Sequence, residues 1–159
     1  MSDRLPISVL LLARDEAARL DRLLPSLGFA REVVVVVDAA SVDDTAAVAE
    51  RHGARVFTRA LDGFGRQRSF ALAQCREPWV LWIDADETLD AAAAAALAGA
   101  LSGVHAGWRI ARRSWFLGRP IRFCGWHSPR AASPTAWSRG SRSPTPRAPM
   151  PTRASPAPV

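Results

Sequence analysis

The chain has 159 residues, the size of one ordinary domain, and its 48% hydrophobic and 23% charged residues are typical of a soluble globular protein. The formal net charge is +6, but every acidic residue lies between Asp3 and Asp90. Residues 1–127 carry 16 Arg against 15 acids, whereas residues 128–159 carry five Arg and no acid. The basic excess belongs to the C-terminal segment, so the charge is no reason to expect that the rest of the chain binds nucleic acid.

An apolar run of strand length stands near the start of the chain. Residues 7–13 (ISVLLLA) show the pattern of a strand that is covered on both faces. Leucines then recur at helical spacing from Ala17 to Leu27, and Gly28 is a stop signal for that helix. Residues 32–38 (EVVVVVD) predict a second buried strand, which ends in a carboxylate.

A second helix and a short third strand are expected next. Ser41 or Asp43 can cap this helix, because their side chains accept hydrogen bonds from the first backbone amides of a helix. Residues 54–59 predict the third strand, and Gly63 and Gly65 mark a turn after it.

The same alternation continues through the middle of the chain. Residues 67–75 predict a helix, and residues 79–83 (WVLWI) predict a fourth strand. The acidic segment Asp84-Ala85-Asp86-Glu87 closes that strand. Residues 90–101 are rich in alanine, the residue with the highest helix propensity, and predict another helix.

The last predicted elements are short. Residues 107–111 and 116–123 predict two strands beside a turn at Gly118. Strands that alternate with helices imply βαβ units and a largely parallel sheet. The predicted fold class is therefore α/β.

Polar residues follow three of the predicted strands. Arg14 and Glu16 come after the first, Asp38 ends the second, and Asp84 and Asp86 come after the fourth. In parallel sheets the ligand site lies outside the carboxyl ends of the strands. A helix cap or a solvated loop accounts for any one of these residues, but poorly for three strand ends that converge in space.

The pair Asp84 and Asp86 is the sharper signal. At positions i and i+2 of an extended backbone, both side chains project from the same face. Two carboxylates placed in this way can hold Mg²⁺ or Mn²⁺ and leave coordination positions for phosphate oxygens. A metal held there neutralises charge on a departing diphosphate. Acidic triplets are common on surfaces, so the evidence for a metal site is the position of this triplet directly after a predicted buried strand.

The chain resembles the family-2 glycosyltransferases of the GT-A fold, and among them the bacterial lipopolysaccharide-core β-1,4-glucosyltransferase-like branch. The resemblance covers nearly all of residues 7–126, in the family's order, through the segments ISVLLLARDEAARL, EVVVVVDAASVDDTAAVAERHGARV, GFGRQRSFALAQ, PWVLWIDADETL and GWRIARRSWFLGRPIRFCGW. It implies a Rossmann-like nucleotide-diphosphosugar transferase fold over residues 1–127, with a mostly parallel sheet between helices.

The resemblance also implies roles for the residues around the nucleotide. Arg14 and Glu16 would lie beside it, and Asp38 would hydrogen-bond the uracil ring. Asp43 belongs to an S-x-D-x-T element that shapes its loop and caps the following helix. Asp15 stands where asparagine is frequent in the family.

The metal and phosphate roles fall on a second group of residues. By the same resemblance, Arg68 would approach the base or the phosphates. Asp86 would be the direct ligand of Mg²⁺ or Mn²⁺, with Asp84 as its partner nearer the ribose and Glu87 behind them. The implied partners are a nucleotide-diphosphosugar donor and a saccharide or lipid-linked saccharide acceptor.

The segment after the resemblance differs in composition. Residues 128–159 contain eight Pro, six Ser, five Arg and no acid, which predicts disorder because little apolar surface is available to offset the ordering entropy. We favour a frameshifted or degenerate continuation over a selected basic tail that binds nucleic acid or an anionic membrane. An inverting transferase also needs a carboxylate general base, which in this family lies downstream of the D-x-D element. No Asp or Glu follows Asp90, so no catalytic residue is assigned.

The leading hypothesis is a metal-assisted, inverting glycosyl transfer from UDP-glucose or a similar donor to a lipopolysaccharide-core or other cell-envelope acceptor. The alternative is a non-catalytic nucleotide-sugar-binding remnant of such an enzyme. A flavodoxin-like or phospho-receiver module would leave Asp84 and Asp86 unexplained, and it would need a lysine that this chain lacks.

The expected location is the cytoplasm. The N-terminus has no secretory signal, and no apolar stretch approaches the ~20 residues that span a bilayer. Peripheral contact with the inner face of the membrane stays open, and no nucleic-acid partner is expected.

Overall fold

The computed structural model describes residues 4–102, 107–108, 110, 114–117 and 119–120. The chain divides into two compact units, residues 1–103 and 104–159. The first unit contains a four-stranded sheet, and the second contains a two-stranded one. The domain boundary predicted at residue 127 lies outside the described residues.

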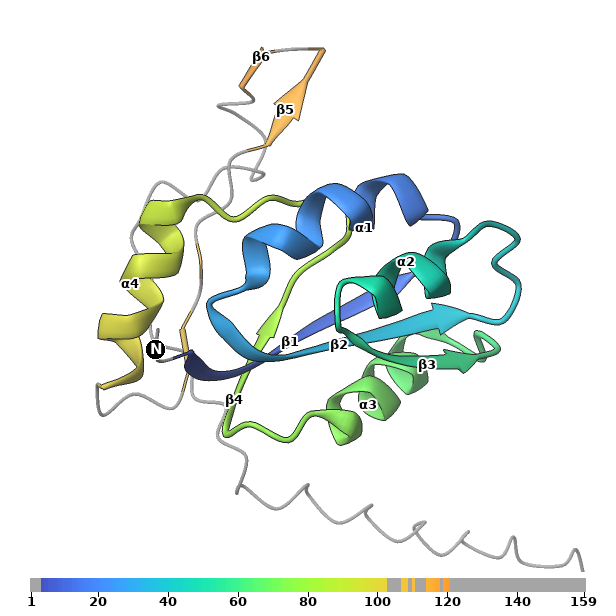
Figure 1. The fold of residues 1–159 in the computed structure, drawn as a ribbon, viewed down its shortest axis with the longest axis horizontal. Helices are drawn as coiled ribbons and strands as arrows, with labels where there is room; N and C mark the ends of the chain where they lie inside the picture. Colours follow the sequence, from blue (N-terminus) through green and yellow to red (C-terminus); the bar gives the residue numbers. More distant parts are fainter. Residues whose placement is uncertain (1–3, 103–106, 109, 111–113, 118, 121–159) are drawn as a thin grey trace, which may run out of the picture. The chain divides into compact units, whose positions relative to one another are not determined.

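Four parallel strands form the sheet of the first unit, in the order β3-β2-β1-β4 (Figure 1). The strands are β1 (Leu5–Ala13), β2 (Ala30–Asp38), β3 (Arg55–Arg59) and β4 (Trp79–Trp82). β1 pairs with two neighbours, so Leu10 lies opposite Val34 on one side and opposite Trp82 on the other. The strand order reverses at β1, as in doubly wound sheets, which confirms the predicted α/β class.

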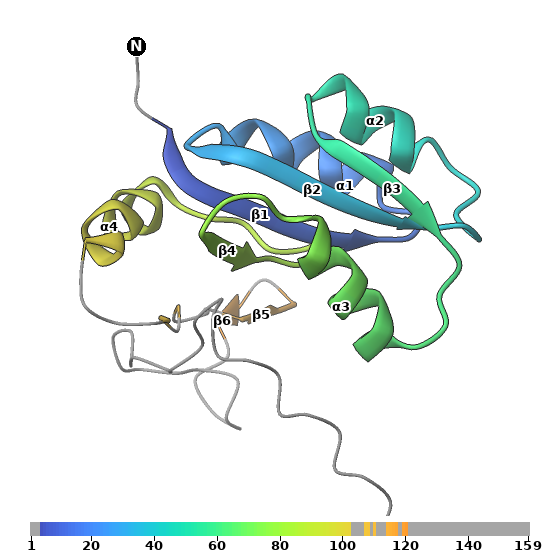
Figure 2. The same cartoon turned by 90° about the horizontal axis from the view of Figure 1, so that it is seen from below.

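Helices cover both faces of this sheet. They are α1 (Ala17–Leu23), α2 (Thr45–Arg51), α3 (Phe64–Gln74) and α4 (Ala91–Leu101), and α1 continues into a short 3₁₀ helix, η1 (Leu24–Leu27). Figure 2 shows α1 and α2 on one face and α3 on the other. Pro25 lies in the first turn of η1, where its missing amide interrupts the hydrogen bonds of the preceding helix.

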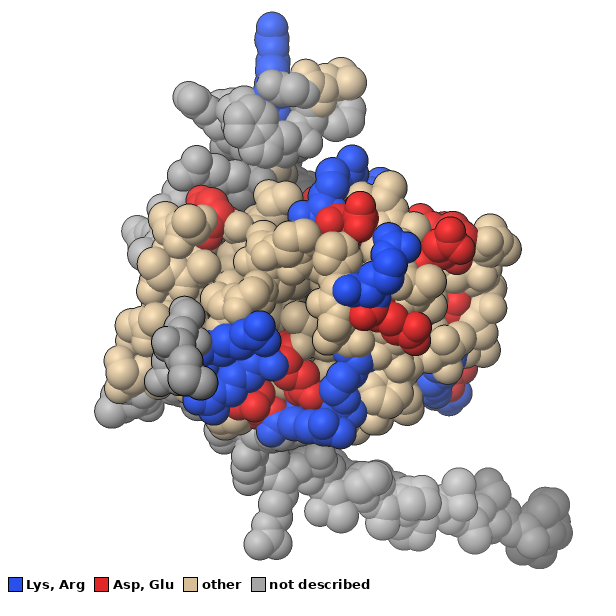
Figure 3. Space-filling model, viewed as in Figure 1, with Lys and Arg blue, Asp and Glu red and all other residues tan. Residues whose placement is uncertain are grey.

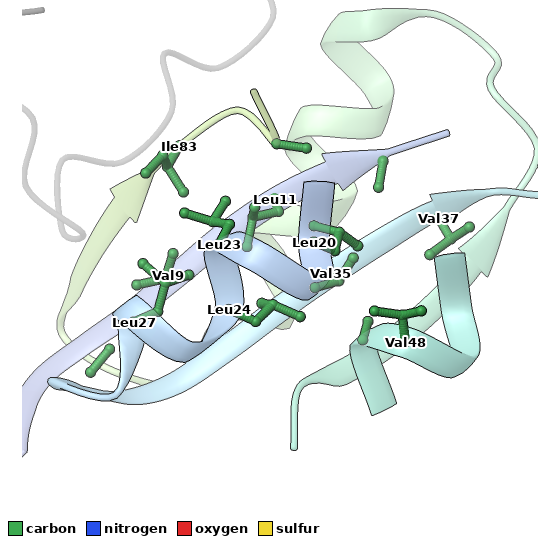
Figure 4. Close-up of a cluster of buried hydrophobic side chains, with 14 of the residues drawn as sticks. Val9, Leu11, Leu20, Leu23, Leu24, Leu27, Val35, Val37, Val48 and Ile83 are labelled. Atoms are coloured by element: carbon green, nitrogen blue, oxygen red, sulfur yellow. The ribbon is translucent and has the colours of Figure 1, made fainter. Parts of the chain in front are cut away.

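The valine run of β2 supplies both cores. Val35 and Val37 pack with the leucines of α1 and with Val48 of α2, as Figure 4 shows. Val34 and Val36 point the other way and pack in a second cluster with residues of α3. Alternate side chains of a strand face opposite sides, so a strand between two helical layers must be apolar at every position. The continuous apolar runs in the sequence arise because helices cover both faces of these strands.

The predicted start of α3 was wrong. The helix was expected to begin at Gln67 after a turn at Gly63 and Gly65, but it begins at Phe64 and includes Gly65. Gly63 is the residue before the helix, and its φ of 122° lies in the region that favours glycine. Of these two glycines, Gly63 alone therefore serves as a turn residue.

The second unit contains a short hairpin among its described residues. β5 (Trp115–Phe116) and β6 (Arg119–Pro120) pair antiparallel, where a turn at Gly118 was predicted. Of the strand predicted over residues 107–111, the described residues form only an isolated bridge at Trp108. In the part of the chain that the structure describes, no helix has the length and apolar character required to cross a bilayer.

A buried carboxylate ties the strands together at their amino ends. The Glu32 side chain of β2 is 9% exposed and accepts hydrogen bonds from the Ser8 hydroxyl of β1 and the Arg55 guanidinium of β3. It also accepts from the backbone N–H of Arg76, just before β4, at 2.8 Å. The Ser8 hydroxyl in turn accepts from the Glu77 N–H at 3.1 Å. This Glu32 cluster joins all four strand segments.

These hydrogen bonds decide the ionisation of Glu32. Burial alone would raise its pKa, but the hydrogen bonds from Ser8, the Arg76 amide and Arg55 outweigh burial and lower the pKa below 4.5. A carboxyl group whose pKa is lower in the folded state stabilises the fold above its unfolded pKa. This contribution is lost as the pH falls through the folded pKa.

We expect Glu32→Gln to lower the free energy of unfolding at neutral pH by about 2 kcal/mol, because it removes hydrogen bonds to a buried charge and leaves Arg55 without its counter-charge. Urea denaturation from neutral pH down to about pH 3 measures this, and the difference from the natural protein should shrink at the acid end. The control is Glu50→Gln, at an exposed position of α2. Equal losses in the two variants would contradict the role of the Glu32 cluster.

Candidate functional site

The carboxyl ends of β1, β2 and β4 meet at one edge of the sheet. The last strand residues that pack on the α3 side are Leu12, Val36 and Trp82. Arg14, Asp38 and Asp84 come two residues further along these three segments. β2 and β4 flank β1, so their ends lie two strand spacings apart, about 10 Å. The fold thus brings the predicted polar residues to one edge.

Asp38 is the most buried acid at this edge, with 7% of its surface exposed. One carboxylate oxygen accepts a hydrogen bond from the Ala40 N–H at 3.1 Å. The other lies 3.5 Å from Nη1 of Arg14, whose side chain is 58% exposed. The carboxylate is therefore held in place by its own loop and by the neighbouring strand end. Arg14 still has donor groups directed to solvent.

The extended backbone expected at Asp84 and Asp86 was wrong, because the chain turns there. β4 ends at Trp82, and the Glu87 N–H donates to the Asp84 carbonyl at 3.0 Å. The Glu87 carboxylate accepts from the Asp84 N–H at 3.1 Å, which closes the turn from the other side. Asp84 and Asp86 are nevertheless both exposed, while Ala85 between them is buried.

The donor chemistry of this turn fits a hard divalent cation. Within the described residues, neither Asp84 nor Asp86 has a side-chain hydrogen bond or an ion pair, so both carboxylates are available. The described residues contain no group of three His, Cys, Asp or Glu side chains that could hold a metal by themselves. Mg²⁺ is often bound through one or two carboxylates together with substrate phosphates and water. Two exposed carboxylates match that mode of binding.

A small cavity of about 130 Å³ adjoins Asp86, and Arg19 and Arg22 of α1 line its other side. Arg19 donates from Nη1 to both carboxylate oxygens of Glu16, at 2.7 Å each. The hydrogen bond to Glu16, and to a smaller extent the charge of Asp86, raise the pKa of Arg19. Glu16 was predicted to lie beside the nucleotide, and in the structure its carboxylate is engaged with Arg19.

Arg68 lies on α3 with its guanidinium over the ring of Trp82, 4.7 Å from the ring centroid. Trp82 is the last residue of β4, two positions before Asp84. A cation over an indole face is attracted by the ring quadrupole. The stacking holds the positive charge of Arg68 close to the carboxyl end of β4, as its predicted role requires.

Side chains from the loop after β2 anchor the loop after β1. The Asp15 N–H donates to Ser41 Oγ at 2.9 Å, and the Glu16 N–H donates to Thr45 Oγ1 at 2.8 Å. The Asp15 carboxylate accepts from the Val42 N–H at 2.7 Å. Asp15 has a φ of 52°, a conformation that asparagine and aspartate tolerate better than most residues. The two loops therefore form one hydrogen-bonded body.

Asp43 is at the centre of this body. Its Oδ2 accepts from the Ala17 N–H at the start of α1, at 3.0 Å. Its Oδ1 accepts from the Thr45 N–H at 3.0 Å, from the Thr45 hydroxyl, and from Ser41 Oγ at 3.3 Å. The N-cap residue of α2 is Asp44 and not Ser41 or Asp43 as predicted, although Asp43 accepts from the first amide of the helix and Ser41 binds the neighbouring loop. Since both oxygens are occupied, the geometry favours a positioning role for Asp43 over direct contact with a ligand.

The hydrogen bond from the Thr45 hydroxyl is the largest influence on the pKa of Asp43. With the Ala17 and Thr45 amides and Ser41, it lowers that pKa below 3.8, against the smaller opposing effect of burial. Sequence reasoning did not find Arg19, Trp82 or the carboxylate of Asp15. The spacing of Glu16 and Arg19 on a predicted helix was an available signal for the first of these. The other two contacts depend on segments that are distant in the sequence.

The profile of the family described as "Glycosyl transferase family 2" matches residues 8–116, more than half of the chain. The chain belongs to this family. Within it, the chain is 36% identical over 125 residues to the lipopolysaccharide core biosynthesis glycosyltransferase LpsC of Rhizobium meliloti. That alignment covers 74% of this chain and 46% of LpsC, so the chain spans less than half of this relative.

A solved structure shares the fold of this family 2 chain. The structure of S. aureus TarS 1–349 superposes with a TM-score of 0.50 and 28% identity, covering 58% of this chain and 31% of TarS. Glucosyl-3-phosphoglycerate synthase from Mycobacterium tuberculosis, in complex with Mn²⁺, UDP-glucose and phosphoglyceric acid, superposes with a TM-score of 0.41 and 32% identity. That match covers 50% of this chain and 33% of the synthase. The fold is the GT-A type that the resemblance implied.

Asp43→Asn is expected to loosen both loops, because an amide nitrogen would face the backbone N–H of Ala17 or of Thr45. Amide hydrogen exchange at Ala17 and Thr45 should become faster, and the midpoint of urea unfolding should fall. In the unsubstituted chain, the same two amides should lose protection as acid protonates Asp43, at a pH below 3.8 because its pKa is lowered.

Asp44→Asn is the matched control, because Asp44 precedes α2 without a side-chain capping hydrogen bond. Its amide exchange should stay close to that of the unsubstituted chain. If both variants exposed Ala17 and Thr45 equally, Asp43 would not be the residue that positions the two loops.

Proposed function

We propose that this chain binds a nucleotide-diphosphosugar at the carboxyl edge of its sheet, and that the donor is UDP-glucose or a close relative. The observation that carries the proposal is the pair of exposed, unpaired carboxylates of Asp84 and Asp86 that directly follows β4, in the described part of the chain. Parallel α/β sheets bind their ligands at this edge. A nucleoside diphosphate is long enough to extend from the end of β2 to the end of β4.

In the proposed complex, each described residue has a task that its geometry supports. Asp38 accepts a hydrogen bond from the base, held in orientation by Arg14 and by its own loop. Arg68, stacked on Trp82, places positive charge near the phosphates. Glu16 fixes Arg19 beside the cavity at Asp86, so the acidic turn has a cationic neighbour when no ligand is present.

Asp86 and Asp84 would hold Mg²⁺ or Mn²⁺, with Asp86 as the direct ligand. When bound, such a cation neutralises the charge that develops on a departing diphosphate. The remaining coordination positions would be filled by phosphate oxygens and water.

The reaction that we propose for this site is an inverting transfer of the sugar to a saccharide or lipid-linked saccharide acceptor of the cell envelope. The likeness to LpsC, whose name places it in lipopolysaccharide core biosynthesis, supports this class of acceptor. We further propose a cytoplasmic location, with the protein in contact with the inner face of the membrane where a lipid-linked acceptor would lie.

The donor site is tested by calorimetry of UDP with and without Mg²⁺. We expect UDP binding to need the metal and to weaken at least about tenfold in Asp86→Ala, the loss that follows from removing one charge-assisted contact. The control is Asp21→Ala, an exposed acid of α1 that pairs with His52. Equal affinity with and without Mg²⁺ would contradict the proposed site.

A second candidate is a nucleotide-sugar-binding protein that does not transfer the sugar. The observation in its favour is that no Asp or Glu follows Asp90, so residues 91–159 offer no carboxylate general base. With UDP-glucose and Mg²⁺, this candidate predicts binding without release of UDP above the buffer rate. UDP release that disappears in Asp86→Ala would instead support a catalytic chain.

A further inference from the structure

A cavity of about 340 Å³ lies at the amino ends of the strands, the edge of the sheet opposite to the proposed donor site. Its lining includes six charged residues: Arg4, Arg31, Glu32, Arg55, Arg76 and Glu77. Figure 3 shows blue side chains on both sides of a small red group along the lower edge of the body. Arginine thus outnumbers acid in a concave place that the proposed function does not use.

The negative charge of Glu32 is already compensated inside the fold. Its carboxylate accepts from the Ser8 hydroxyl, the Arg55 guanidinium and the Arg76 N–H. Arg55 is occupied in the same way, because it also donates to the Gln74 carbonyl at 2.9 Å. These two charges cancel each other within the wall of the cavity, and neither needs a ligand.

Three other guanidinium groups of the lining keep donors available. The Arg76 side chain is 71% exposed, and its guanidinium Nε lies 4.0 Å from Glu32, beyond hydrogen-bond distance. Arg31 is 49% exposed; its Nε donates to the Arg4 carbonyl at 3.1 Å, and its Nη1 lies 3.6 Å from Glu77, which leaves Nη2 for a ligand. Arg4 is exposed and makes no ion pair within the described residues. Against these three cations stands one partly exposed acid, Glu77.

We propose that this cavity binds a phosphate-class oxyanion, the phosphate group of a mono- or diester. Guanidinium groups present planar pairs of N–H donors that match two oxygens of a phosphate. The walls of the cavity exclude part of the solvent, and charge-assisted hydrogen bonds are stronger in such a place than on an open surface. Arg76 and Arg31 supply the donors, and the compensated Glu32 cluster forms the base.

This site is independent of the proposed function. It uses no residue of the donor site and lies at the other end of the strands, so either assignment can fail without the other. The same phosphate chemistry is available from a small phosphate ester and from the headgroup of an anionic lipid.

The first experiment titrates the full chain with inorganic phosphate, without nucleotide or metal, and follows the amide and arginine Nε–H resonances by NMR. We expect saturable shifts at Arg31, Glu32, Arg76 and Glu77, but not in the loops after β2 and β4. Arg76→Gln should weaken this binding about tenfold, as expected for one charge-assisted contact. The substitution keeps the backbone N–H that Glu32 requires, so the fold is retained.

Arg66→Gln is the matched control. Arg66 is 76% exposed and lies on α3 at the other edge of the sheet. Its substitution by Gln removes the same charge as Arg76→Gln does. Phosphate binding in the cavity should be unchanged by it. Equal weakening in the two variants would reduce the effect to general charge and overturn the site. The absence of saturable shifts at the cavity residues would overturn it as well.

The second experiment distinguishes the two sources of the phosphate group by sedimentation with lipid vesicles. Retention on vesicles that contain phosphatidylglycerol, reduced by Arg76→Gln and by free phosphate, would assign the headgroup as the source. No retention, together with phosphate binding in solution, would assign a soluble phosphate ester. Retention that is equal in Arg76→Gln and in the unsubstituted chain would contradict the lipid source.

Discussion

The parallel pairing of β1 with β2 on one side and β4 on the other is the constraint on which the rest of the structure depends. It requires apolar side chains on both faces of the central strands, because α1 and α2 cover one face and α3 covers the other. It also places all the carboxyl ends at one edge and all the amino ends at the opposite edge. The two edges therefore have different polar residues, and the charges of these residues have different roles.

At the amino edge, the charge of Glu32 is neutralised by hydrogen bonds within the fold. Glu32 is buried between strands and satisfied by donors from β1, from β3 and from the segment before β4. A buried carboxylate in a protein needs such partners, because an unpaired one would cost several kcal/mol. At the carboxyl edge, Asp84 and Asp86 are exposed, and within the described residues they are left without ion pairs. This difference separates an acid that stabilises the sheet from a pair available to a ligand.

Side-chain hydrogen bonds join the loops at the carboxyl edge. Asp43 bonds the first amides of α1 and α2 together, and Asp15, Ser41 and Thr45 add further bonds between the same loops. A binding site on loops needs such support if its side chains are to keep their positions without a ligand. Asp38 and Arg14, at the ends of the strands that lead into these loops, gain a fixed geometry from it.

The sequence by itself determined the strands, the helices and the residues at the strand ends, because apolar runs and helical leucine spacing are local patterns. It also carried the family resemblance that the profile match confirms. Only the tertiary structure decided which acid is hydrogen-bonded within the fold, as Glu32 is, and which acids are available to a ligand, as Asp84 and Asp86 are. The turn at Asp84–Glu87, the start of α3 at Phe64, the bond from Ala17 to Asp43 and the stacking of Arg68 on Trp82 all came from it. The last two of these join residues far apart in the chain, and the energy of such contacts depends on burial and on distances that no local sequence pattern shows.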